Sequence, residues 1–129
     1  MIRVFLLDDQ PATRAVLRLR LELEPDLVVV GESGNDHDTV AQMRALTPDV
    51  VILDAVTVLL DVGPASARLR ELALGWVVVV LTLHDDAATR GRALAAGAKH
   101  VVSKQGTDGL LLAAIRAAAV PRSSSGSAL

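Results

Sequence analysis

The 129-residue sequence contains no cysteine, which excludes disulfide scaffolds, thiol nucleophiles, and cysteine-ligated zinc or iron–sulfur centres. Aromatic side chains are almost as scarce, because Phe5 and Trp76 account for the whole 2%. The core must therefore be built from Val, Leu, Ile and Ala, a mixture that is typical of parallel strands covered by helices.

The sequence also lacks a concentration of positive charge and a long apolar segment. It carries 13 Lys and Arg against 15 Asp and Glu, dispersed along the chain, so a nucleic-acid groove made by this chain alone is not expected. The longest charge-free apolar region, Leu72 to Leu83, is too short to cross a bilayer, and the first residues show no signal-peptide cleavage pattern. We expect a soluble cytoplasmic protein that makes no membrane contact.

Five short apolar runs alternate with five segments of helical spacing. The runs are continuous rather than interrupted by polar residues, which is typical of strands buried on both faces of a sheet. The predicted strands are Ile2–Leu7, Leu27–Val30, Val50–Leu53, Trp76–Leu81 and Val101–Val102, and the predicted helices are Pro11–Glu24, His37–Leu46, Pro64–Leu74, Ala87–Ala96 and Thr107–Ala119. This order predicts one α/β domain over residues 1–119, with a doubly wound five-stranded parallel sheet. Residues 120–129, rich in Ser, predict a flexible C-terminal linker or tail.

Polar side chains follow four of the five predicted strands. Asp8 and Asp9 follow the first strand, Asp54 the third, Thr82 the fourth and Lys104 the fifth. Ligands of an open parallel sheet bind beyond the carboxyl ends of the strands, and right-handed crossovers place the first and third strands side by side. We therefore expect Asp8, Asp9 and Asp54 to converge.

Three converging carboxylates repel one another and lose hydration, so they require a proton or a cation between them. Oxygen ligands without His or Cys favour Mg²⁺ or a similar hard cation that accepts phosphate oxygens. Thr82 can donate a hydroxyl hydrogen bond, and Lys104 can place an ammonium group against an anion. The set suits phosphoryl transfer onto a carboxylate, with these two residues contacting the transferred oxygens.

In the order and spacing of four segments, the sequence resembles the receiver domains of two-component response regulators over essentially Ile2 to Ala119. The matching segments are Phe5-Leu6-Leu7-Asp8-Asp9-Gln10-Pro11, Pro48-Asp49-Val50-Val51-Ile52-Leu53-Asp54, Leu81-Thr82-Leu83-His84-Asp85-Asp86 and Gly97-Ala98-Lys99-His100-Val101-Val102-Ser103-Lys104. Within that family, the Asp-Asp-Gln-Pro start and the Gly-Ala…Ser-Lys ending are most similar to regulators of the NarL/FixJ (LuxR-type) class.

The resemblance implies a flavodoxin-like, CheY-like fold and a phosphoprotein whose Asp54 receives a phosphoryl group from a sensor histidine kinase. It implies that Asp8 and Asp9 hold Mg²⁺. Asp54 itself and the backbone carbonyl of Val56 would complete the protein ligands, and the polar residues after the fourth and fifth strands would contact the phosphoryl group. The implied role is a regulatory domain rather than a metabolic enzyme.

The implied output is transcriptional regulation. DNA would be contacted only through a C-terminal helix-turn-helix domain that this chain does not contain. A homodimer would form through the face of the fourth helix, fifth strand and fifth helix.

Two departures from the family pattern leave a second interpretation open. After Asp54 the family usually has a Met-Pro pair, which residues 55–63 lack, so the loop beside the site is less constrained. Val101 stands where the family has a switch aromatic, so coupling between Thr82 and a rotating ring cannot operate in the usual way. The alternative is a receiver that signals without phosphorylation, through protein contacts or ligand binding. A small Mg²⁺-dependent phosphohydrolase is a third interpretation, for which the chain lacks room for a substrate-binding cap.

The remaining features have simpler interpretations. His37, His84 and His100 lie in three different segments without ligand spacing, so they do not predict a metal site. Helical spacing in the first helix comes from Val16, Leu19 and Leu23. The stripe of the last helix predicts core packing first and a dimer face second, and consists of Leu110, Leu111, Ala114, Ile115 and Ala118.

Overall fold

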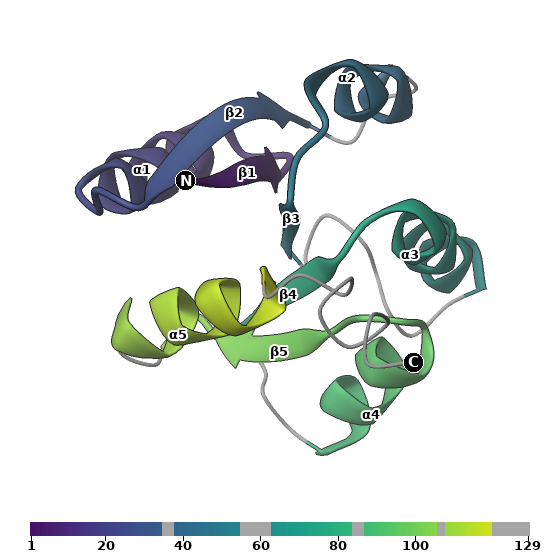
Figure 1. Cartoon of the computed structure of the whole chain (residues 1–129). Helices are drawn as coiled ribbons and strands as arrows, with labels where there is room; N and C mark the ends of the chain where they lie inside the picture. The colour runs from purple at the N-terminus through teal and green to yellow at the C-terminus, as the bar shows by residue number, and fades with distance from the viewer. Residues whose placement is uncertain (35–37, 55–62, 84–86, 106–107, 120–129) are drawn as a thin grey trace, which may run out of the picture.

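The computed structural model of the chain describes residues 1–34, 38–54, 63–83, 87–105 and 108–119. In these residues strands and helices alternate as predicted (Figure 1), in the order β1 Ile2–Leu7, α1 Pro11–Glu22, β2 Leu27–Ser33, α2 Thr39–Leu46, β3 Val50–Asp54, α3 Gly63–Gly75, β4 Val78–Thr82, α4 Ala87–Ala95, β5 His100–Ser103 and α5 Asp108–Ala118. None of the described helices has the length and apolarity needed to cross a membrane. The linker or tail predicted at 120–129 lies outside the described residues.

The sheet has the predicted doubly wound, parallel order, β2-β1-β3-β4-β5. β1 pairs with β2 on one side and with β3 on the other, and the β1–β3 ladder runs from Val4 opposite Val50 to Leu7 opposite Leu53. The adjacency of the first and third strands, predicted from crossover handedness, is therefore confirmed. It brings the carboxyl ends of β1 and β3 together at the point where the strand order reverses.

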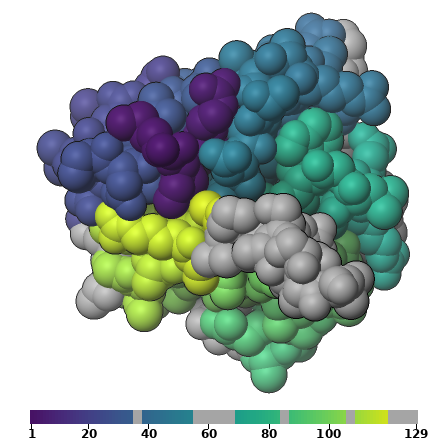
Figure 2. Space-filling view, in the orientation of Figure 1, coloured from purple at the N-terminus to yellow at the C-terminus, as the bar shows by residue number. Residues whose placement is uncertain are grey.

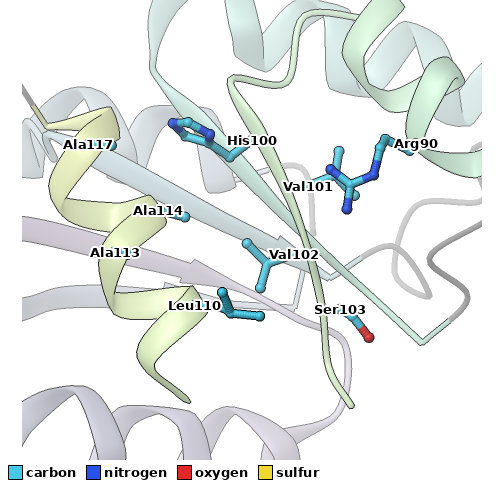
Figure 3. Close-up of a pocket in the computed structure, with 9 residues that line it drawn as sticks. All are labelled: Arg90, His100, Val101, Val102, Ser103, Leu110, Ala113, Ala114 and Ala117. Atoms are coloured by element: carbon cyan, nitrogen blue, oxygen red, sulfur yellow. The ribbon is translucent and has the colours of Figure 1, made fainter. Parts of the chain in front are cut away.

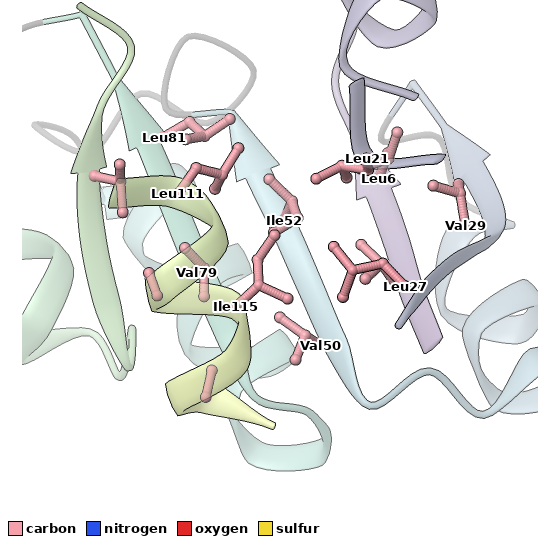
Figure 4. Packing of buried hydrophobic residues seen from close by; sticks show 14 residues of the cluster. Leu6, Leu21, Leu27, Val29, Val50, Ile52, Val79, Leu81, Leu111 and Ile115 are labelled. Carbon is pink, nitrogen blue, oxygen red and sulfur yellow. The ribbon is translucent and has the colours of Figure 1, made fainter. Parts of the chain in front are cut away.

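Successive residues of each strand supply opposite faces of the sheet, and each face has its own core. On β1, Val4 and Leu6 belong to a cluster covered by α1 and α5, whereas Phe5 and Leu7 belong to a cluster covered by α2, α3 and α4. Figure 4 shows the first of these, in which Ile115 of α5 packs above the β3 and β4 side chains. Burial on both faces explains why the strands read as continuous apolar runs in the sequence.

The apolar stripe that marks α1 in the sequence is not the stripe that packs on the sheet. Val16, Leu19 and Leu23 are 66%, 69% and 79% exposed, whereas Leu21 is fully buried and Leu17 packs against the core. Both stripes have helical spacing, so periodicity alone does not choose between them. Arg14 and Arg18, beside the inner stripe, reach Glu32 on β2 and so add ion-pair contacts on that side of the helix.

Four of the five strands differ from their predicted bounds, because backbone pairing, not side-chain type, sets strand length. β3 and β4 each end one residue later than predicted, at Asp54 and Thr82, which pair with the neighbouring strand. β2 continues through Ser33, since after a register shift its last residues still pair with β1. β4 begins at Val78, two residues later than predicted, because the Trp76 N–H still donates to the Leu72 carbonyl at the end of α3. β5 extends to His100 and Ser103, which pair with β4.

The last helix is tied to the loop between α1 and β2. The guanidinium of Arg116 on α5 donates to Glu24 and to both oxygens of Asp26, at 2.7 to 2.9 Å. Figure 2 shows α5, in yellow, lying against the purple and blue N-terminal part of the molecule. Two segments that are 90 residues apart in the sequence are therefore joined on the side of the sheet that α1 and α5 cover.

Gly97, after α4, provides a direct test of the packing between α3 and α4. Its φ is +112°, and a Cβ at this position would lie 2.6 Å from the Cβ of Ala73. We expect Gly97→Ala to lower the free energy of unfolding by about 1–3 kcal/mol, because it adds both backbone strain and overpacking. Urea denaturation measures the change. Gly91→Ala is the matched control, since its Cβ would meet open space in the interior of α4 and should stabilise by about 0.5–1 kcal/mol.

Candidate functional site

Four polar residues lie at the carboxyl ends of neighbouring strands. Asp8 follows β1, Asp54 ends β3, Thr82 ends β4 and Lys104 follows β5. Asp8, Asp54 and Thr82 are 4%, 4% and 3% exposed. Such burial is unusual for the two carboxylates unless they are paired. Parallel strands place these groups at one edge, so the fold itself concentrates charge there.

Lys104 forms an ion pair with Asp54, in which the ammonium group donates to Oδ2. The lysine backbone is held as well, because its N–H donates to the Thr82 carbonyl at 2.8 Å and so extends the pairing of β4 with β5. Asp54 is therefore a buried carboxylate with a positive charge fixed beside it.

Asp8 lies beside Asp54, and its pKa is raised. Burial raises the pKa of the Asp8 carboxyl above its ordinary value of 3.8, because a low-dielectric environment disfavours the charged form. The hydrogen bond to Asp54 and the negative charge of Asp54 raise this pKa further. The Gln10 backbone N–H, which donates to Asp8 Oδ1 at 2.9 Å, and the charge of Lys104 act in the opposite direction.

The structure brings together only part of the predicted metal site. Asp9 is exposed, and among the described residues no three His, Cys, Asp or Glu side chains form a group that could hold a metal ion. Val56 lies outside the described residues. The ligand set of Asp8, Asp9, Asp54 and the Val56 carbonyl therefore stays a prediction.

The chemistry of the residues that do meet fits a hard cation. Asp8 and Asp54 offer carboxylate oxygens from adjacent buried positions, and the pKa of Asp8 is raised first by burial and further by the neighbouring Asp54. A divalent cation that prefers oxygen ligands would offset the negative charge of the two carboxylates. The residues present thus fit Mg²⁺.

One group of residues at this edge was missed by the sequence analysis. The guanidinium of Arg14 on α1 donates to the backbone carbonyl of Asp8 at 2.6 Å and pairs with Glu32 on β2. The available signal was the position of Arg14, one helical turn before the buried Leu17 and Leu21 stripe. An arginine on the inner side of an amphipathic helix requires a partner on the sheet.

The histidines lie apart in the chain and have no part in the contacts just described. His100 is half-buried on β5, and its Nε2 is buried without a hydrogen-bond partner. His37 and His84 lie outside the described residues.

Comparisons with known proteins agree with this geometry. The family model of the response regulator receiver domain matches residues 4–116. The transcriptional regulatory protein UhpA of Salmonella typhimurium is 34% identical over 119 residues, covering 92% of this chain and 59% of that relative. A protein-glutamate methylesterase/protein-glutamine glutaminase of Anaeromyxobacter dehalogenans is 33% identical over 105 residues, covering 81% of this chain and 31% of that relative.

Among solved structures, a LuxR-family two-component response regulator from Aurantimonas sp. is similar with a TM-score of 0.73 and 28% identity, over 89% of this chain and 82% of that one. The present chain spans less than two thirds of the length of the two curated relatives.

The buried acidic pair predicts a pH-dependent stability for the metal-free protein. Since the pKa of Asp8 is raised on folding, the folded state binds this proton more tightly than the unfolded state. The free energy of unfolding should then fall as the pH rises above about 4 and through the folded-state pKa. Asp8→Asn keeps the acceptor for Gln10 and removes the charge, so it should be more stable than the unmutated chain at pH 7, with the difference vanishing at low pH.

Urea denaturation from pH 3 to 8 without divalent cations measures this difference. Asp9→Asn removes a charge from the exposed neighbouring position and serves as the control. A stability difference for Asp8→Asn that does not change with pH would contradict the burial account.

Proposed function

Because the chain belongs to the family of response regulator receiver domains, we propose that it accepts a phosphoryl group on Asp54 from a sensor histidine kinase and thereby switches a transcriptional output. The observation that carries this proposal is the burial of Asp54 in an ion pair with Lys104, beside the protonation-prone Asp8. A carboxylate so placed is shielded from water and already faces the positive charge that transferred oxygens need.

The chemistry follows from the contacts. A carboxylate oxygen of Asp54 attacks the phosphorus of a phosphohistidine donor, a P–O bond forms, and the P–N bond breaks as the leaving imidazole takes up a proton. Lys104 moves from pairing with the free carboxylate to neutralising the phosphoryl oxygens, and the Thr82 hydroxyl donates to one of them. When bound by Asp8, Asp9 and Asp54, with the Val56 carbonyl, Mg²⁺ would supply further positive charge for these oxygens.

Hydrolysis of the acyl phosphate returns Asp54 to its free form and resets the switch. The domain therefore catalyses only its own phosphorylation and dephosphorylation and acts on no separate metabolite. The methylesterase named among the relatives aligns over only 31% of its length, and its activity is a property of that larger protein.

The output is proposed to lie outside this chain. Relatives such as UhpA are transcriptional regulatory proteins of greater length, so DNA would be contacted through a C-terminal helix-turn-helix domain. The charge of the present chain is dispersed along its sequence, which does not favour a basic groove of its own. Such a regulator, with a kinase as its phosphate source, would act in the cytoplasm without membrane contact.

A homodimer through α4, β5 and α5 is the proposed route from phosphorylation to output. A groove of about 370 Å³ lies across this face. Figure 3 shows the residues that line it, which are Arg90, His100, Val101, Val102, Ser103, Leu110, Ala113, Ala114 and Ala117. Leu110, predicted as part of the core stripe, is 57% exposed here, while the rest of that stripe is buried. Its free apolar surface and the small alanines beside it suit close approach of a second copy.

Val101 favours the second candidate function, a receiver that signals without phosphorylation. It is 5% exposed and belongs to the core cluster under α4, so this position offers no ring that could move between an inner and an outer state. Signalling would then depend on protein contacts or a ligand at the same face. Transfer to Asp54 distinguishes the two functions.

Incubation with Mg²⁺ and acetyl phosphate or phosphoramidate should add a single phosphoryl group, measured by intact mass. Asp54→Asn should lose the adduct completely, because an amide is not a nucleophile for this reaction. Asp49→Asn, at the opposite end of β3, is the matched control and should keep it. Absence of any adduct on the unmutated chain with both donors would favour the phosphorylation-independent receiver.

For the dimer, light scattering after gel filtration should show a larger mass with Mg²⁺ and beryllium fluoride than without them. Leu110→Glu should keep the protein monomeric, because a charge would be buried at the centre of the apolar contact. Leu74→Glu changes a more exposed leucine at the end of α3 and should leave the dimer intact. A monomer under both conditions argues against this interface.

A further inference from the structure

We propose that Arg14 is a positioning residue for Asp8 and Asp9, the neighbouring acids expected to hold Mg²⁺, and that it acts through the backbone carbonyl of Asp8. The inference rests on the proposed function and deepens it. It assigns to α1 a role at the carboxyl edge of the sheet, besides its packing on the sheet through Leu17 and Leu21.

Asp8 is held through its backbone and its side chain, and one of its partners is a side chain from a helix. The Asp8 N–H donates to the Ser33 carbonyl at 3.0 Å, its Oδ1 accepts the Gln10 N–H at 2.9 Å, and its carboxyl group is hydrogen-bonded to Asp54. The Asp8 carbonyl accepts a hydrogen bond from Arg14 Nη1 at 2.6 Å. This carbonyl begins the peptide that leads to Asp9, so Arg14 fixes the plane that joins the two acids.

The guanidinium of Arg14 is itself held by Glu32 on β2. Arg14 Nε lies 3.4 Å from one carboxylate oxygen of Glu32, and the other oxygen lies 2.7 Å from Nη1 of Arg18. The side chains of Arg14 and Glu32 are 17% and 27% exposed, so solvent screens their interaction less than that of a surface pair. Glu32 pairs with Leu6 in the β2–β1 ladder, so its carboxylate starts from the strand next to β1, which Asp8 follows.

The backbone leaves room for this guanidinium. A Cβ at Gly34 would lie 3.4 Å from Arg14 Nη1 and 4.0 Å from the Asp8 carbonyl oxygen. Both distances are ordinary van der Waals contacts, so the residue after β2 lies directly beside the guanidinium and the Asp8 carbonyl that it contacts.

Charge balance explains why a cation here does not oppose metal binding. Arg14 and Arg18 share Glu32, and Arg18 also pairs with Glu22 at 3.1 Å, so the two arginines face two carboxylates. The network supplies hydrogen-bond geometry to Asp8 with little net charge. Residues that hydrogen-bond to metal ligands without touching the metal themselves typically contribute 10- to 100-fold to metal affinity.

The test compares Arg14→Gln with Arg18→Gln, using Mg²⁺ and phosphoramidate as probes. Both variants lose an ion pair to Glu32, but only the first loses the contact with the Asp8 carbonyl. Arg14→Gln should raise the Mg²⁺ concentration for half-maximal phosphorylation about 10-fold, while the rate at saturating Mg²⁺ changes less than threefold. Arg18→Gln should leave both quantities within twofold of the unmutated chain.

Melting temperatures without Mg²⁺ separate positioning from folding. If the two variants lose similar stability but differ in Mg²⁺ dependence, the positioning role is supported. Equal Mg²⁺ dependence in the two variants would overturn it, and Arg14 would then only stabilise the contact between α1 and β2. Should Arg14→Gln fail to fold, Glu32→Gln, which releases the guanidinium without deleting it, is compared with Glu22→Gln on the same criteria.

Failure of the proposed function has a different signature. In that case the unmutated chain itself would show no Asp54-dependent adduct at any Mg²⁺ concentration, and the positioning role would fall with it. An adduct on the unmutated chain together with unaltered Mg²⁺ dependence in Arg14→Gln would instead overturn the positioning role alone.

Discussion

Two carboxyl groups, Asp8 and Asp54, are buried next to each other, and the only cation that pairs with either side chain among the contacts described above is Lys104. Most of the site follows from this constraint. Burial raises the pKa of Asp8 and the neighbouring Asp54 raises it further, whereas Asp54 holds the lysine in an ion pair. The two carboxyl groups therefore differ in their partners, and an added cation would offset the negative charge of Asp54 beside Asp8.

The sequence could predict this arrangement because it depends on topology more than on detail. Given five buried strands, the handedness of crossovers fixes β1 beside β3, and the residues after those strands must meet. Asp8, Asp54, Thr82 and Lys104 could be identified by position alone. Asp9 could not be placed in the same way, because a residue two positions into a loop has no fixed direction relative to the sheet.

Other features depended on interactions that sequence patterns do not encode. The packing stripe of α1 lies beside Arg14 and Arg18, which reach Glu32, a residue that itself lay beyond the predicted end of β2. The exposure of Leu110 depended on where α5 sits over β5, although its neighbours on the same helix are buried as expected. In both helices the sequence contained more apolar positions than one core-facing stripe requires, and only packing decided which stripe was used.

The link between Arg116 and the loop holding Glu24 and Asp26 has a consequence for how the chain folds as it is synthesised. The face of the sheet covered by α1 is completed only by α5, whose side chains fill the same cluster as Val4 and Leu6. A ribosome must therefore release nearly the whole domain before that face is closed. Until then Val4 and Leu6 of the internal strand β1 lack the part of their cover that α5 supplies, so the nascent N-terminal half depends on late contacts of long sequence separation.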